Sequence, residues 1–263
     1  MHGWKRLLMV GPVWPMLISA GCDGTLGPQG KELLSAGSAA FHRAEYEDSV
    51  RYLDTFLKDH GKSQGADEAY FVRGLAKYKL KDRPGAASDL KEALNRTKLD
   101  HIRVHALNAL GDLAWDRNDM ALAESMYRQA LANVKEDQRP ADHSHYRLGC
   151  VLQRQGAWDD ADLQFDRVIH FFGNSELGKL AARHVRCRAW TIQAGAYRQK
   201  ALADAEAKRF QTENLPANVQ SATDRGQLLF LVHVGRYPTY PQAGSALEIV
   251  KRHNADAYVT PTR

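Results

Sequence analysis

The chain has 263 residues, of which 44% are hydrophobic and 25% are charged, and its formal net charge at pH 7 is +5. This composition excludes a disordered polypeptide and a chain that lies mainly within a membrane. The length suffices for one large domain or two ordinary ones. The net charge is too small to demand a nucleic-acid partner.

The first 22 residues differ from the rest of the chain. A short cationic head with Lys5 and Arg6 precedes an apolar run over residues 7–18, and small residues then lead to Cys22. This order is typical of a secretory signal peptide, and the run is too short to span a bilayer. We therefore expect residues 1–21 to be removed and the mature protein to be exported.

The segment SAGC (19–22) resembles the lipobox of bacterial lipoproteins, in which the peptidase cuts before the cysteine and the thiol carries a diacylglycerol. The resemblance implies lipidation at Cys22, a linker over 22–29 and anchorage to a bacterial membrane, inner or outer. Ser19 departs from the family, which prefers leucine there, and an ordinary signal peptide is the alternative. Asp23 resembles an inner-membrane retention signal of some bacteria.

The long middle part of the chain repeats a glycine, at positions 37, 74, 111 and 149. Further along the chain from each glycine comes a small residue, and four positions after that small residue comes a large one. The four pairs are Ser49 and Leu53, Ala86 and Leu90, Ala123 and Tyr127, and Ala161 and Phe165. Glycine and the small residue allow two helices of a pair to approach closely. We expect the large residue to fill the gap between successive pairs.

This pattern resembles the tetratricopeptide repeat (TPR), whose usual period is about 34 residues. The resemblance implies four repeats over residues 30–173, a capping helix over residues 174–187, and a concave face that holds a peptide or a partner helix. The acidic stretch WDDAD (158–162) is interpreted as a helix start, where carboxylates suit the helix dipole.

Several histidines and cysteines require a decision about metal binding. The pairs His101-x3-His105 and His143-x-His145 lack the neighbouring carboxylate of a metalloprotease, and they are interpreted as surface and packing residues. Cys150 and Cys187 have no metal-ligand spacing around them, and the sequence allows a disulfide between them as an alternative to two free thiols. We expect no metal and no cofactor.

The C-terminal part contains a duplication. IQAGAY (192–197) and VHVGRY (232–237) are 40 positions apart, and the match continues without a gap to Val219 and Val259. Each copy changes from alternation at period two to helical spacing and back. The elements expected are strands at 190–197, 215–219, 228–235 and 256–260, helices at 200–211 and 241–252, and a turn over 221–227 between the copies. The order βαββαβ predicts a four-stranded antiparallel sheet with both helices on one face, so the whole chain is α+β.

The motif Gln-x-Gly-small-aromatic and its echo resemble a SPOR domain, over residues 188–262. SPOR domains bind peptidoglycan, preferring glycan strands whose stem peptides amidases have removed, at division sites and other zones of wall remodelling. The excess charge of +4 in residues 188–263 suits strands with exposed lactyl carboxylates.

Alternation along the strands divides the side chains between two faces. The core face is expected to hold Trp190, Ile192, Ala194, Ala217, Val219, Phe230, Val232, Val234, Ala257 and Val259. The open face is expected to display Thr191, Gln193, Asn218, Gln220, Leu231, His233, Tyr258 and Thr260.

The family places its glycan on this open face, and Gln193 matches the family's glutamine in the first strand. The resemblance therefore implies a peptidoglycan site of Gln193, Thr191, Ala196, Asn218, Leu231, His233 and Tyr258. Leu231 stands where an arginine is frequent, and Ala196 replaces a loop serine. These departures imply binding that is weaker or differently placed than in the family.

We expect a non-catalytic, exported lipoprotein that binds peptidoglycan and recruits an unidentified protein through its TPRs. No Ser-His-Asp, Cys-His or paired-carboxylate arrangement stands out. One alternative is an outer-membrane assembly or secretion factor whose SPOR-like sheet no longer binds glycan. The other is an RNA-recognition module, which has the same strand order but needs exposed aromatic residues on its central strands. The export signal argues against RNA, so no nucleic acid is expected as a partner.

Overall fold

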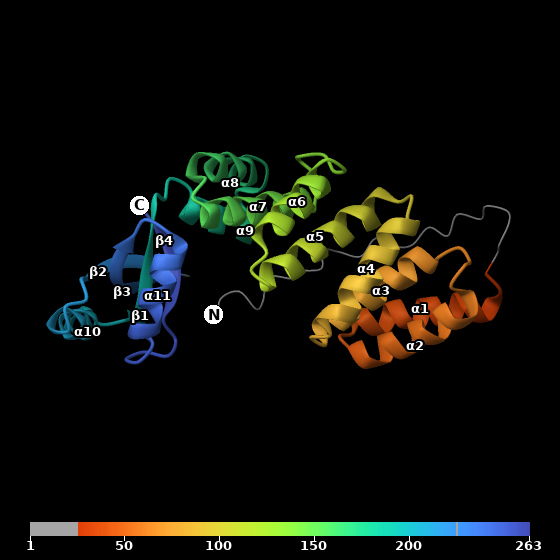
Figure 1. Cartoon of the computed structure of the whole chain (residues 1–263), viewed down its shortest axis with the longest axis horizontal. Helices are drawn as coiled ribbons and strands as arrows, with labels where there is room; N and C mark the ends of the chain where they lie inside the picture. The colour runs from red at the N-terminus through yellow and green to blue at the C-terminus, as the bar shows by residue number, and fades with distance from the viewer. Residues whose placement is uncertain (1–25, 225) are drawn as a thin grey trace. The chain divides into compact units, whose positions relative to one another are not determined.

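The computed structural model describes residues 26–263 apart from residue 225 (Figure 1). The predicted signal peptide, Cys22 and Asp23 lie outside the described residues. The helices are α1 (Pro28–His42), α2 (Tyr46–His60), α3 (Ala66–Lys79), α4 (Arg83–Arg96), α5 (Asp100–Asp116), α6 (Met120–Leu131), α7 (Ala141–Gln155), α8 (Trp158–Phe172), α9 (Glu176–His184), α10 (Lys200–Thr212) and α11 (Tyr240–Val250). The strands are β1 (Ala189–Tyr197), β2 (Ala217–Asp224), β3 (Gln227–Tyr237) and β4 (Tyr258–Thr262).

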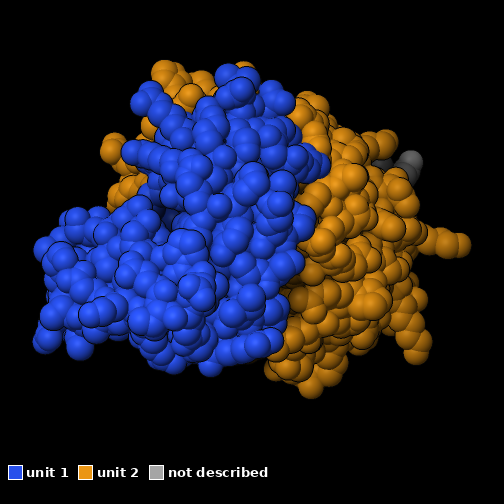
Figure 2. All heavy atoms as spheres, turned by 60° about the vertical axis from the view of Figure 1, so that its left-hand side comes forward, with its two compact units in different colours: residues 1–12, 152–163, 180–263 blue, residues 13–151, 164–179 orange. Residues whose placement is uncertain are grey.

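Two compact units make up the chain, and Figure 2 colours them separately. Of the described residues, one unit contains 26–151 and 164–179, and the other contains 152–163 and 180–263. None of the helices within the described residues is both long and apolar enough to cross a membrane.

The helices α1 to α8 form four consecutive hairpins, as the glycine period predicts (Figure 1). The turn of each hairpin contains one residue in the left-handed region, at Ala44, Lys81, Asn118 and Gly156. These turn residues recur with the same spacing as the repeated glycines at positions 37, 74, 111 and 149. The same backbone conformation therefore recurs in the turns of all four hairpins. The first helix begins at Pro28, inside the predicted linker 22–29, because the fixed φ of proline suits the first turn of a helix.

The repeated glycine lies directly under the large residue of its own hairpin. A Cβ added at Gly111 would come within 2.6 Å of the Tyr127 ring, and one at Gly149 within 2.6 Å of the Phe165 ring. All four large residues of the pattern are fully buried. Each therefore packs over the glycine of its own hairpin, where the missing side chain leaves room for it. Leu53 and Leu90 also share hydrophobic clusters with residues of the next hairpin, in α3 and α5, as expected of residues that fill the gap between hairpins.

The helix α9 occupies part of the predicted capping segment 174–187. Its C-terminal residue His184 is linked to Gln153 of α7 by two contacts: the Gln153 amide donates to the His184 carbonyl at 2.9 Å, and Gln153 Oε1 lies 2.9 Å from His184 Nδ1. Both residues belong to the C-terminal unit. Burial lowers the pKa of His184 to about 4, so its ring is neutral at pH 7.

The C-terminal sheet has the strand order β2-β3-β1-β4 with every neighbouring pair antiparallel. The predicted α+β class and the order βαββαβ are confirmed. The hairpin turn is tighter than the predicted 221–227: β2 continues to Asp224, β3 begins at Gln227, and Gly226 adopts a φ of +80° between them. The residues Ser221, Ala222 and Thr223 pair with β3, which removes them from the turn.

One face of the sheet forms the core with both helices. Ile192, Ala194, Val232 and Val234 pack with residues of α10 and α11, among them Phe210 and Val250. The other residues predicted for the core join this cluster as buried or partly buried members: Phe230 of β3, and Ala217, Val219, Ala257 and Val259 at the outer strands.

Trp190 is the exception among the predicted core residues. It is buried but lies outside that cluster, with its ring centroid 5.5 Å from Trp158 at the start of α8 and 5.0 Å from Tyr240 at the start of α11. Arg154 covers the Tyr240 ring at 4.0 Å from its centroid and donates a hydrogen bond to the Tyr240 hydroxyl. Trp190 therefore joins the sheet to helical residues of the same unit, a non-local contact that strand alternation cannot reveal.

The predicted helix start at WDDAD is also confirmed, since α8 begins at Trp158. Its acidic residues have a further role in the C-terminal unit. Asp162 accepts from the Arg186 backbone amide at 2.7 Å, and Arg188 pairs with Asp162 at 2.8 Å and with Asp159 at 2.9 Å.

Candidate functional site

The two Gly-x-Tyr motifs that mark the duplication shape the central strands. In each motif the tyrosine ring lies over the glycine two residues earlier: a Cβ at Gly195 would be 2.7 Å from Tyr197, and one at Gly235 would be 2.3 Å from Tyr237. Gly235 also has a φ of +70°, in the left-handed region that favours glycine. These positions require glycine because an aromatic ring occupies the place of its side chain.

Two irregularities interrupt the pairing of β1 with β3. Trp190 pairs with Tyr237 but Ile192 pairs with Val234, so β3 carries one extra residue there. Further along, β1 carries the extra residue, Ala194, whose carbonyl accepts from the Asn254 side-chain amide at 2.5 Å. Such bulges change which face later side chains occupy.

The second bulge places Ala196 on the face of the sheet opposite to the core that α10 and α11 form with it, which we call the uncovered face. Ala196 pairs with Leu231, and Tyr197 pairs with Phe230 on the core face. Without the bulge, alternation from Ile192 would have put Ala196 in the core. Ala196 is exposed and belongs to β1, in agreement with the expected strand 190–197, although the serine that it replaces in the family lies in a loop.

The uncovered face carries one polar row that crosses all four strands. The pairings run from Asn218 in β2 to His233 in β3, to Gln193 in β1 and to Tyr258 in β4. Directly opposite residues of antiparallel strands project from the same face, so these four side chains form one continuous line. We call this line the polar row, and all four of its members were predicted site residues.

The polar row carries no charge at neutral pH. Burial lowers the pKa of His233, so its imidazole is neutral. Burial raises the pKa of Tyr258, and the nearby Arg183 opposes that shift. His233 is 9% exposed, and its buried Nδ1 has no hydrogen-bond partner within the part of the chain that the structure describes. Such a row of neutral amide, imidazole and phenol groups is suited to hydroxyl and amide groups of a ligand.

Thr191 is not displayed as predicted. It is 2% exposed, and its hydroxyl donates to the carbonyl of Gly235 at 2.7 Å and contacts that of Val234 at 3.3 Å. These bonds lie at the first bulge, where the extra β3 residue turns its carbonyl toward Thr191. Thr191 therefore stabilises the bulge, and its hydroxyl is not free for a ligand.

A second row lies beside the polar row on the same face. Leu231 pairs with Gln220 in β2 and with Ala196 in β1, and two residues further along β3 Leu229 pairs with Ala222. The predicted site included Leu231 and Ala196 but not Ala222, which was expected in the turn 221–227, nor Leu229, which was expected in the strand 228–235 but was not assigned to the open face.

The helical repeats contain a buried polar cluster centred on Asp112. Its carboxylate accepts from the Tyr127 hydroxyl at 2.6 Å and from Arg147 at 2.6 Å, and His143 lies 3.4 Å away. Burial alone would raise the pKa of Asp112, but Arg147 and His143 hold it well below its ordinary value. These contacts link α5, α6 and α7.

The histidines tested for metal binding have other contacts. His105 packs against Phe71 at 6.3 Å between ring centroids, and burial lowers its pKa to about 4. His145 Nδ1 lies 2.8 Å from Gln164 Oε1. The part of the chain that the structure describes contains no group of three His, Cys, Asp or Glu residues that could hold a metal ion. Cys150 and Cys187 are both buried free thiols.

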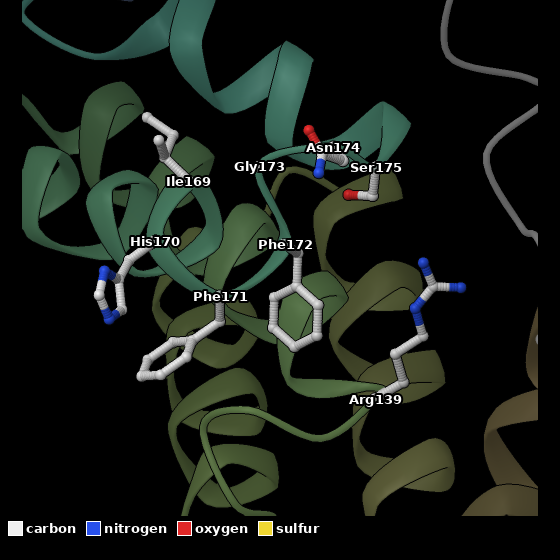
Figure 3. A pocket seen from close by; sticks show the side chains of 8 residues that line it. All are labelled: Arg139, Ile169, His170, Phe171, Phe172, Gly173, Asn174 and Ser175. Carbon is white, nitrogen blue, oxygen red and sulfur yellow. The ribbon is translucent and has the colours of Figure 1, made fainter.

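An open hollow of about 580 Å³ lies at the C-terminal end of α8 (Figure 3). Its lining consists of Arg139, Ile169, His170, Phe171, Phe172, Gly173, Asn174 and Ser175. Figure 3 shows Arg139 extending from the loop before α7 toward the turn at Asn174 and Ser175. Arg139 also pairs with Asp142 at 3.4 Å. No predicted site residue lines this hollow, and it adds no reactive group to the molecule.

Comparisons with known proteins identify the two parts. Residues 188–261 match the model of the SPOR domain. A tetratricopeptide repeat protein from Parabacteroides merdae has a similar structure, with a TM-score of 0.51 and 13% identity over 71% of this chain and 66% of that one. MamA from Desulfovibrio magneticus RS-1 has a TM-score of 0.49 and 18% identity over 61% of this chain and 93% of its own. No curated protein matches the chain.

The chain therefore consists of TPR-like helical repeats followed by a C-terminal SPOR domain. A SPOR domain implies peptidoglycan binding and a place in the cell envelope, and TPR-like repeats imply interactions with proteins. Domains of both kinds are typically non-catalytic.

Proposed function

We propose that this protein is a non-catalytic lipoprotein of the cell envelope that binds glycan strands stripped of their stem peptides. In this proposal the SPOR domain holds the strand on its uncovered face, the repeats recruit a protein partner, and the process served is wall remodelling or division. Cys22 carries the lipid that attaches the chain to a membrane.

The observation that carries the proposal is the polar row. Its four neutral side chains span the full width of the sheet on the face that neither α10 nor α11 covers. At a strand spacing of about 4.8 Å, the row extends over roughly 15 Å, which suits an extended chain of sugars. His233 and Gln193 lie at its centre, on the two inner strands of the sheet.

The chemistry of the row also favours sugar over phosphate. None of the residues at its four positions is charged, and a phosphate backbone is recognised mainly by Lys and Arg. The ten Lys and Arg residues of 188–263 lie at other positions, where they add a diffuse positive field. Such a field suits the lactyl carboxylates that amidases expose.

Co-sedimentation of the full chain with purified sacculi tests the proposal, with and without amidase treatment of the walls. We expect enrichment on amidase-treated walls. Gln193→Ala, which removes an amide from the centre of the row, should weaken binding about fivefold, the effect of roughly one lost hydrogen bond.

Lys208→Ala is the matched control, because Lys208 is exposed on α10, across the sheet from the row. It should sediment as the unmodified chain does. Equal sedimentation of Gln193→Ala and the unmodified chain would move the glycan site elsewhere. Failure of the unmodified chain to bind any wall would favour the alternative of a TPR-type assembly or secretion factor whose sheet has lost glycan binding.

The lipid anchor has its own test. Intact-mass measurement of the chain expressed in a bacterium should show a diacylglycerol adduct that Cys22→Ser abolishes. A mass that corresponds to cleavage elsewhere, without lipid, would leave an ordinary signal peptide.

A further inference from the structure

The uncovered face of the sheet divides into two kinds of surface. Beside the polar row, at the end of the sheet near the β2–β3 hairpin, lie Ala196, Ala222, Leu229 and Leu231, which we call the apolar strip. The register places the strip on the same face as the polar row, because Leu231 and His233 are two residues apart on β3. The two surfaces are therefore contiguous.

The apolar strip does not belong to the hydrophobic core. None of its four members is part of the cluster that the sheet forms with α10 and α11. Ala196 is exposed, and Ala222, Leu229 and Leu231 are half-buried. The strip offers no side-chain donor or acceptor, so it can only contribute contacts with apolar groups of a ligand.

Adjacent side chains on one face of a strand are separated by about 6.6–6.8 Å. A glycan strand lying along the polar row would therefore present its substituents to the strip. The sugars of peptidoglycan carry acetamido groups, whose methyl carbon is the apolar part of the substituent and whose amide can bond to neighbouring polar groups. Gln220 pairs with Leu231, and Gln193 lies in the adjacent polar row on the same strand as Ala196, so an amide is next to each of these apolar residues.

We infer that the apolar strip receives the N-acetyl methyl groups of the bound glycan, and that this protein selects N-acetylated over N-deacetylated strands. The inference rests on the proposed function, since it assigns a further specificity to the same surface. Deacetylation would remove the methyl group and place an ammonium against Leu231, where burying a charge without a partner is unfavourable. The excess charge of +4 in residues 188–263 opposes that ammonium as well.

The test uses the full chain and amidase-treated sacculi in three forms: unmodified, chemically N-deacetylated, and re-acetylated with acetic anhydride. We expect binding to fall about tenfold on deacetylated walls and to recover on re-acetylated ones. Leu231→Ala should weaken binding to acetylated walls about fivefold, the change expected when roughly half of the apolar contact of a leucine is lost. Leu231→Ala should also reduce the preference for acetylated walls.

Leu229→Ala serves as a second variant with a smaller effect in the same direction. Leu228→Ala is the matched control: Leu228 lies on the same strand and is 55% exposed, but it alternates onto the other face. Melting temperatures identify any variant that fails to fold.

Two results would overturn the inference while leaving the proposed function intact: equal binding to acetylated and deacetylated walls, or a Leu231→Ala variant with the affinity and preference of the unmodified chain. A preference for acetylated walls that persists in both leucine variants would assign it to net charge and not to the strip. Absence of binding to every wall would instead overturn the proposed function itself, and the inference with it.

Discussion

Two buried polar side chains, Asp112 in the helical repeats and His233 in the SPOR sheet, differ in how they are bonded. In the repeats, the Asp112 carboxylate is 1% exposed as a residue and is bonded to Tyr127, Arg147 and His143. In the sheet, His233 is 9% exposed, and its Nδ1 has no hydrogen-bond partner among the described residues. Groups of the chain therefore supply hydrogen bonds to the Asp112 carboxylate, whereas the described residues supply none to His233 Nδ1.

The difference concerns these two side chains and not their regions, because the described part of the repeats also contains buried side-chain atoms without a hydrogen-bond partner, at Ser38, Ser49, Glu68, Asn108 and His145. A buried charge with all its partners fixes neighbouring helices, and removing one partner is costly. A buried polar atom without a partner costs stability unless something else supplies the bond. The His233 side chain lies on the face of the sheet that α10 and α11 do not cover. Substitutions in the two regions therefore test whether the Asp112 cluster has a structural role and which side chains of the sheet contact the glycan.

The largest effect is expected for Asp112→Ala. It leaves Arg147, with its side chain 15% exposed, without its carboxylate partner, so the free energy of unfolding should fall by about 3–5 kcal/mol. Chemical denaturation measures the change. Asp116→Ala is the control, because this carboxylate is more exposed and pairs with Arg83 at 3.2 Å near the surface. Its loss should cost less than about 1 kcal/mol. Equal effects of the two substitutions would contradict a structural role for the Asp112 cluster.

A smaller effect is expected for Gly111→Ala. The new methyl group would meet the buried Tyr127 ring at 2.6 Å, and overpacking of this kind costs about 1–3 kcal/mol. Gly244→Ala in α11 is the opposite case, since a Cβ there meets nothing within 4 Å. Alanine should stabilise that helix by about 0.5–1 kcal/mol. Thermal unfolding of both variants distinguishes a glycine under an aromatic ring from one in open space.

A pH-dependent effect is expected for Glu68→Gln. Burial, with Asp67 nearby, raises the pKa of Glu68 from 4.5 to about 7. Between pH 4.5 and 7 the unfolded chain loses this proton while the folded protein retains it, so the wild-type side chain reduces stability as pH rises through that window. The glutamine variant should gain about 1–2 kcal/mol over wild type at pH 8 and little at pH 4. A constant difference across this range would contradict the raised pKa.

The smallest effect is expected for Thr191→Val. The substitution retains the shape of the side chain but removes the hydroxyl that donates to the Gly235 carbonyl, so stability should fall by about 1 kcal/mol. Glycan binding should not change, because the Thr191 hydroxyl already has protein partners. A loss of wall binding at unchanged stability would return Thr191 to the ligand site.

Much of this architecture follows from patterns in the sequence. The glycines at 37, 74, 111 and 149 predicted four helical hairpins, and the echo of IQAGAY in VHVGRY predicted the βαββαβ order. Both signals are local, since helix pairs and Gly-x-Tyr motifs involve residues close together in the chain. All four members of the polar row, Asn218, His233, Gln193 and Tyr258, lie at positions that alternation in the sequence assigned to the open face.

The remaining features depend on contacts between distant residues. A bulge at Ala194, supported by Asn254, determines that Ala196 lies on the uncovered face. The burial of Thr191 follows from the other bulge, and the position of Trp190 follows from its contacts with Trp158 and Tyr240. Nothing in the local sequence around Trp190 or Thr191 specifies these partners, because register shifts are set by pairing across the sheet.

The most direct test is an NMR titration of the isotopically labelled full chain with glycan strands released from amidase-treated walls. The side-chain amide signals of Gln193 and Asn218 and the imidazole signals of His233 should shift together, and those of Gln211 on α10 should stay in place. Saturable shifts confined to the polar row and its neighbours would establish the uncovered face as the glycan site. Shifts on α10 and α11, with the polar row unchanged, would contradict it.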